Sequence, residues 1–155
     1  MKNILGLPVS ETEKNIELLN VLLANFQIHY QNLRGLHWNI RGRRFFELHV
    51  KFEELYNQAQ LRIDEIAERV LTLEGTPLHT FEDYLNNNKI VIGKNIANDV
   101  EGVELIVKSL SVLLEIEREI LSNASDINDE GTTSMMSDLI TEQEKDIWML
   151  KAFLD

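Results

Sequence analysis

Apolar residues recur at steps of three and four along almost the whole chain, which is the spacing of amphipathic helices. One such stretch begins at Ser10 and ends before Gly42, and a second runs from about Phe45 to Leu73. A third begins near Asn95, and a fourth carries apolar residues from Met136 to Leu154. No alternating strand pattern competes with them, so the sequence predicts an all-α fold.

The apolar stripes define the predicted core. In the first helix the stripe is Ile16, Leu19, Leu23, Phe26, Tyr30 and Leu33, and the next step of four falls on His37. In the second it is Phe45, Leu48, Phe52, Leu55, Ala59, Ile63, Ile66, Val70 and Leu73. In the third it is Ile96, Val100, Val103, Val107, Leu110, Leu114 and Leu121, and in the fourth Met136, Ile140, Ile147, Leu150 and Leu154.

Turn and capping residues separate these segments. Ser10 and Glu13 form a capping box at the start of the first helix, and Gly75-Thr76-Pro77 ends the second. Thr80 and Asp83 are a candidate cap pair for a short helix that follows, and a polar loop over 122–133 precedes the last helix. Four long helices with a long connection between the second and the third predict a four-helix bundle with one crossover connection. The short helix lies within that crossover.

Composition narrows the class of protein. A chain of 155 residues that is 44% hydrophobic suits a single domain, 1–155. Residues 1–9 of this domain are expected to form a short N-terminal tail. The absence of cysteine excludes disulfides and thiolate metal sites, and no apolar run approaches the length of a membrane span or a signal peptide. These features suit a cytoplasmic protein.

Charge argues against nucleic acid as the main partner. Lys and Arg number 15 against 26 Asp and Glu, a net charge of −11, which repels a phosphate backbone. The basic cluster of Arg41, Arg43 and Arg44 is small, and the N-terminus offers only Lys2 and Lys14. An acidic surface attracts cations, although charge alone favours an ordinary solvated acidic surface.

The four histidines all lie in the first half of the chain. His29 lies off the predicted stripe of the first helix and His79 lies in a loop, so both are interpreted as surface or hydrogen-bonded side chains. His37 lies on the apolar stripe, and a lone histidine there is more often a core residue than a ligand. Its neighbours on the second helix change that interpretation.

His49, Glu53, Asp64 and Glu68 lie within an arc of about 100° on the second helix. Glu53 and Asp64 are nevertheless separated by roughly 16 Å along the axis, whereas metal ligands lie about 2.0–2.6 Å from the ion. One helix cannot therefore bring both pairs to one ion, but two antiparallel copies around a twofold axis can. The spacing supports two interpretations equally: metal sites shared across a dimer interface, and an ordinary acidic bundle without metal.

The ligand types favour iron, manganese or zinc over calcium or copper. Bundles that enclose a two-iron centre use a Glu-x-x-His motif on each of two helices, and that motif does not occur here. A two-iron centre within one chain is therefore rejected.

The stretch "HWNIRGRRFFELHVKFEELY", followed by "QLRIDEIAERVLTLEG", resembles the signature of the Dps family of ferritin-like proteins, and the resemblance covers the whole chain. It implies a ferritin-like four-helix bundle that assembles into a hollow dodecamer. Such proteins oxidise Fe(II), preferably with hydrogen peroxide, and store the ferric mineral inside, which protects against oxidative stress.

By position, the resemblance implies that His37 and His49 are iron ligands from one subunit and that Asp64 and Glu68 come from its twofold mate, with two irons in each site. Glu53 occupies a position where many members have Asp. Trp38 resembles an aromatic residue near the ferroxidase centre, with a packing or radical-quenching role, and Glu54 is a candidate for mineral nucleation.

The acidic residues Asp126, Asp129 and Glu130 lie near the position where relatives line threefold pores, although charges that favour a helix N-terminus explain them as well. DNA compaction is doubtful without a basic arm, and nucleoid association would depend on it. The alternatives to a ferroxidase and iron store are a DNA-binding nucleoid protection protein and a non-catalytic acidic helical assembly.

Overall fold

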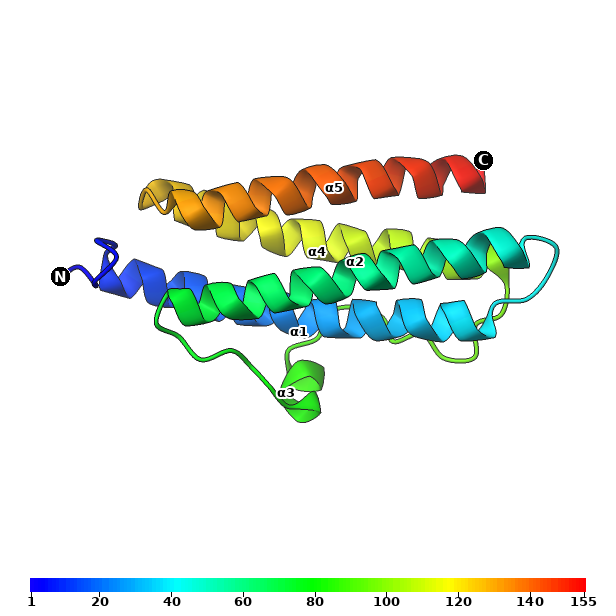
Figure 1. The fold of residues 1–155 in the computed structure, drawn as a ribbon, viewed down its shortest axis with the longest axis horizontal. Coiled ribbons are helices and arrows are strands. Elements are labelled where there is room, and N and C mark those ends of the chain that lie inside the picture. Colours follow the sequence, from blue (N-terminus) through cyan, green and yellow to red (C-terminus); the bar gives the residue numbers. More distant parts are fainter.

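The computed structural model of the protein describes all residues from Met1 to Asp155. Its helices are α1 (Val9–Asn39), α2 (Phe45–Thr72), α3 (Phe81–Asn86), α4 (Asp99–Asp126) and α5 (Glu130–Leu154). The four long helices lie side by side in a bundle, and α3 lies outside it against α1 (Figure 1). The predicted four-helix bundle with a short helix in its crossover is confirmed.

The connections fix the directions of the helices. A short turn that contains Gly42, whose φ of 115° is unfavourable for other residues, returns the chain from α1 into α2. The link from α2 to α4 travels the length of the bundle, so α2 and α4 run in the same direction (Figure 1). The end of α1 therefore lies beside the start of α2, and the end of α4 lies at the same end of the bundle as the end of α2. His37, near the end of α1, comes close to the start of α2.

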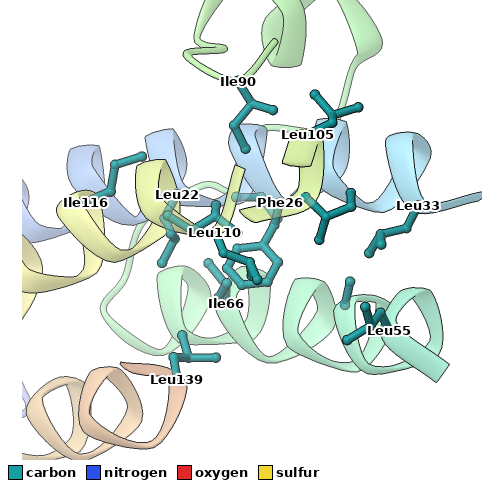
Figure 2. Packing of buried hydrophobic residues seen from close by; sticks show 14 of the residues in the cluster. Leu22, Phe26, Leu33, Leu55, Ile66, Ile90, Leu105, Leu110, Ile116 and Leu139 are labelled. Carbon is teal, nitrogen blue, oxygen red and sulfur yellow. The ribbon is translucent and has the colours of Figure 1, made fainter. Parts of the chain in front are cut away.

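One apolar cluster fills the bundle. It combines residues from all four long helices, among them Phe26, Ile66, Leu110 and Leu139, which converge in Figure 2. Phe52 and Leu22 are fully buried. This continuous core holds the backbone of α1 and α2 in place, and these two helices carry the candidate ligands.

Several local predictions need correction. Ser10 does not cap α1, because the helix already begins at Val9 after Pro8, and its hydroxyl bonds the Glu11 carboxylate instead. The predicted loop over 122–133 is much shorter, since α4 continues to Asp126 and α5 starts at Glu130. Thr80 does cap α3, accepting a hydrogen bond from the Asp83 amide at 3.1 Å, as predicted.

Val103 and Leu110 of the predicted α4 stripe are buried, but three other positions are displaced by one residue. Ile106, Leu113 and Ile120 are buried, whereas the predicted Val107, Leu114 and Leu121 are half-buried beside them. The first eight residues are also more structured than a plain tail, because Lys2 pairs with Pro8 and the Asn3 side chain accepts hydrogen bonds from the Leu5 and Leu7 amides. None of the helices is both long enough and apolar enough to cross a membrane.

Candidate metal centre

His37 and His49 meet where the end of α1 passes the start of α2. Their rings stack with centroids 3.8 Å apart and planes 13° from parallel. Tyr56 lies edge-on to His37 at 5.4 Å, and Phe45 stacks on the other face of His49 at 4.9 Å. His37 is buried and His49 is half-buried, so aromatic packing fixes both rings at the edge of the core.

A reciprocal pair of hydrogen bonds sets the orientation of both rings. His37 Nδ1 lies 2.6 Å from the His49 carbonyl oxygen, and His49 Nδ1 lies 2.7 Å from the His37 carbonyl oxygen. A carbonyl oxygen only accepts, so each Nδ1 carries a hydrogen and donates it. The Nε2 atom of each neutral ring then keeps a free lone pair, which is the arrangement found in histidines that bind metals.

Glu53 lies one turn after His49 on α2, with its side chain exposed. The Tyr56 hydroxyl donates to Glu53 Oε1 at 3.5 Å, and burial, reinforced by the Glu53 charge, raises the pKa of Tyr56. Trp38 is 57% exposed, and the Arg34 guanidinium lies 4.9 Å from its ring centroid. Two imidazoles, one carboxylate and three aromatic rings therefore gather at this end of α2.

Asp64 and Glu68 lie towards the other end of α2, and both are exposed. No hydrogen bond or ion pair to another side chain occupies either carboxylate. Asp64 borders an open hollow of about 590 Å³ that Leu61 and Ala67 also line. The two acidic side chains are thus free to meet a ligand from outside the chain.

No three histidine or acidic side chains of the single chain lie close enough to hold a metal ion. The candidate ligands instead form two groups along α2: His49 and Glu53 near its start, joined there by His37 from the end of α1, and Asp64 and Glu68 towards its end. Roughly 16 Å of helix separates the groups. Each group is an incomplete ligand set by itself.

The prediction for His29 was wrong, and of the two interpretations of Asp129 the structure favours the charge at a helix N-terminus. His29 is 4% exposed and makes no hydrogen bond through Nδ1, so it is neither a surface side chain nor a hydrogen-bonded one. Asp129 is 2% exposed and receives hydrogen bonds from Arg69 and Thr132, so its carboxylate caps α5 and does not face an opening. Asp126 and Glu130 are exposed.

Glu54 and His79 lie on the surface. Glu54 pairs with Lys51 at 3.6 Å, and His79 Nδ1 contacts the Pro77 carbonyl oxygen at 3.0 Å. The prediction that His79 lies in a loop with an exposed side chain is therefore confirmed. Neither residue contributes to the histidine pair.

Sequence reasoning missed a buried polar group inside the bundle. Glu117 of α4 is fully buried, and burial raises its pKa to about 8. Gln143 of α5 donates to Glu117 Oε2 at 2.7 Å. Glu117 follows the same steps of three and four as Leu110, Leu113 and Ile120. A charged residue at a core position of this pattern could have revealed the buried carboxyl.

Comparisons with known proteins agree with the fold. The ferritin family model, described as a ferritin-like domain, matches residues 16–155. The "DNA protection during starvation protein 2" of Bacillus anthracis is 38% identical over 90% of this chain and 96% of its own length. A crystal structure of a Dps protein from Bacillus brevis is 35% identical, with a TM-score of 0.92 and complete coverage of both chains.

The Dps protein from Vibrio cholerae O1 is more similar still, with 47% identity and a TM-score of 0.97 over 99% of this chain and 97% of that chain. That structure is described as a member of a broad superfamily of ferritin-like diiron-carboxylate proteins. The fold and the matched domain thus define a ferritin-like protein. Within that class, the chain belongs to the Dps family.

Proposed function

We propose that this protein is a ferroxidase and iron store, in which two chains related by a twofold axis share each reaction site. His37, His49 and Glu53 would come from one chain, and Asp64 and Glu68 from the other. The observation that carries the proposal is the reciprocal hydrogen bonding of His37 and His49, which leaves two Nε2 atoms free on one side of an incomplete ligand set.

Antiparallel pairing supplies the missing half. A twofold axis near the middle of α2 places the Asp64 end of one chain against the His49 end of the other, and it generates two equal sites at once. Exposed apolar residues on the same helix, Leu61 at 67% and Val50 at 51%, suit burial against a second copy. The closed assembly proposed is a hollow dodecamer.

The ligand types suit iron as the substrate. Carboxylates stabilise Fe(III), and neutral imidazoles bind Fe(II) without adding negative charge. The proposed oxidant is hydrogen peroxide: two Fe(II) each give one electron, the O–O bond breaks, and two protons complete two molecules of water. Because both electrons are delivered at one site, no hydroxyl radical is released, and the ferric product is stored inside the shell.

This chemistry also accounts for protection without DNA binding. Relatives carry the name "DNA protection during starvation protein". Here the net charge of −11 and the small basic cluster favour protection by removal of Fe(II) and peroxide. We expect no stable complex with duplex DNA at physiological salt in a gel-shift series.

The shared site is tested by mixing two inactive variants. His49→Ala and Asp64→Ala assemblies should each lose peroxide-driven Fe(II) oxidation in stopped-flow measurements. In a mixed dimer, one site carries both substitutions and the other carries neither, since its ligands come from the unmutated positions. Random co-assembly of equal amounts should therefore restore about a quarter of the wild-type sites.

The outcome separates the alternatives. Equal oxidation rates in the His49→Ala particle and the wild type would remove the ferroxidase proposal. Inactive single variants with no recovery on mixing would place the whole site within one chain. A Glu119→Gln particle serves as control, because Glu119 is an exposed carboxylate of α4 away from α2. Particle size and helix content are checked for every sample.

A further inference from the structure

A small cavity lies between the four long helices, separate from the histidine pair. Its volume is about 20 Å³, enough for one water molecule or one metal ion. Its polar lining residues are His29 of α1, Gln58 of α2, and Glu142, Gln143 and Asp146 of α5. Apolar side chains, among them Phe26 and Leu110, form the rest of the wall.

Two of these polar side chains have an unused hydrogen-bonding atom. His29 and Gln143 are each 4% exposed, yet His29 Nδ1 and Gln143 Oε1 have no hydrogen-bond partner. The Gln143 amide nitrogen donates to Glu117, so the amide oxygen is the unused group of this side chain. A buried polar atom without a partner costs about 1–3 kcal/mol, which is a reason to expect a ligand.

Asp146 adds a half-buried carboxyl to the same cavity. Burial raises its pKa, the Lys51 charge and a hydrogen bond with Gln58 act in the opposite direction, and none of the ion pairs in the chain includes it. Glu142, at the same cavity, is different because Arg62 donates to both of its oxygens at 2.9 and 2.7 Å. The cavity therefore contains one carboxylate that no lysine or arginine contacts in an ion pair.

A water molecule would satisfy the hydrogen bonds of His29 and Gln143, whereas a cation would bind both of them and also the Asp146 carboxylate, which makes no direct ion pair. Burial lowers the pKa of His29 to about 4, so its ring is neutral near pH 7 and can offer a lone pair. Imidazole nitrogen with carboxylate and amide oxygen suits first-row divalent metals, since calcium prefers oxygen alone.

We propose that this cavity is a mononuclear divalent-metal site within a single chain, with His29, Gln143 and Asp146 as its protein ligands. Only two of these are histidine or acidic residues, and the amide oxygen of Gln143 is the third. His29 lies eight residues before His37, about 12 Å along α1 and turned by roughly 80°, so the two sites do not share ligands.

Cobalt binding tests the proposal without depending on iron oxidation. The full-length protein carrying His37→Ala and His49→Ala is stripped with a chelator, so that both imidazoles of the histidine pair are absent. When Co²⁺ is then added, we expect the protein to bind one ion per chain, with visible absorption from a mixed nitrogen and oxygen environment. Adding His29→Leu should weaken this binding by about tenfold or more.

His79→Leu in the same background is the matched control, because it removes an exposed histidine and should leave the bound cobalt unchanged. If His29→Leu does not assemble, Asp146→Asn replaces it, since that half-buried side chain is changed without altering its volume. A cobalt-edge anomalous map should place the ion between α1 and α5.

Cobalt stoichiometry that is the same with and without His29 would overturn the proposal, as would an anomalous peak elsewhere or a cavity that holds only water. Oxidation of Fe(II) in the otherwise wild-type His29→Leu particle should be normal, because the shared site is intact. Failure of the cavity site and failure of the proposed ferroxidase are therefore distinguishable.

Discussion

Two carboxylates are buried in this bundle, and they are stabilised in opposite ways. Asp129 receives a 2.7 Å bond from Arg69 and bonds from the Thr132 amide and hydroxyl at 3.0 and 2.6 Å. Glu117 receives one bond from Gln143, and its other oxygen has no partner. One region thus holds a satisfied charge, and the other holds a carboxyl that burial keeps protonated at neutral pH.

The contrast shows that the sequence around an acidic residue is a poor guide to whether its side chain is buried and what it stabilises. Asp129 belongs to an acidic segment between α4 and α5, and its charge stabilises the start of α5. Glu117 belongs to a regular heptad-like stripe, but its position in the core makes its protonation state part of the stability of the bundle. The two regions predict different responses to mutation and to pH.

The largest expected effect follows removal of the cation beside Asp129. Arg69→Met leaves a carboxylate that is 2% exposed without its charged partner, and breaking a buried pair in this way costs about 3–5 kcal/mol. Thermal unfolding of the assembled particle should therefore shift to clearly lower temperature. Arg118→Met is the matched control, since its pair with Glu144 is more than half exposed on both sides and contributes about 1 kcal/mol or less.

Equal shifts for the two arginine variants would contradict this difference between the regions. The Arg69 side chain also lies against Gly131, where an added Cβ would meet the guanidinium at 2.7 Å. Gly131→Ala should therefore reproduce part of the Arg69→Met loss by displacing the same side chain.

A pH effect is expected from Glu117. Its pKa is raised from 4.5 to about 8 in the folded chain, so the folded state binds more protons than the unfolded state between these values, and stability is lost as pH rises through 8. His29 acts in the other direction, because its lowered pKa of about 4 makes stability fall as pH drops below 6.5. The two slopes oppose one another below pH 6.5.

Between pH 6.5 and 8 only the Glu117 slope remains, and it amounts to roughly 1–2 kcal/mol. Denaturant unfolding at pH 6.5 and 8 measures it. Glu117→Gln keeps the acceptor for the Gln143 amide and should flatten the dependence, whereas Glu119→Gln on the exposed face of α4 should not. A slope that persists in Glu117→Gln would show that other groups cause it.

Periodicity predicted the bundle because four apolar stripes require one another as partners, but it could not fix their phase where two apolar residues adjoin. Val107 follows Ile106, and Leu121 follows Ile120, so either choice keeps the helical step. In α1 the same ambiguity assigned Tyr30 to the core, whereas His29 is the buried residue. The choice of the apolar residue Tyr30 therefore hid the buried position of His29.

The candidate ligands were a different case. Spacing separated His49 and Glu53 from Asp64 and Glu68 because rise per residue is a fixed property of a helix. It could not reveal the reciprocal bonds between His37 and His49, since these depend on how the end of α1 crosses the start of α2. The role of Asp129 was hidden for the same reason, because its partner Arg69 is 60 positions away along the chain.

The smallest expected effects come from two adjacent threonines at the Asp129 end of the bundle. The Thr132 hydroxyl donates to Asp129 at 2.6 Å and accepts from Arg69 at 2.9 Å, whereas the buried Thr133 hydroxyl has no partner. Thr132→Val should cost about 1–2 kcal/mol, because it removes hydrogen bonds to charged groups. Thr133→Val should be neutral or slightly stabilising, because it removes an unsatisfied polar atom without changing the shape of the side chain. Denaturant midpoints of the two variants measure the difference, and a reversed order would mean that the satisfied network around Asp129 does not stabilise this end of the bundle.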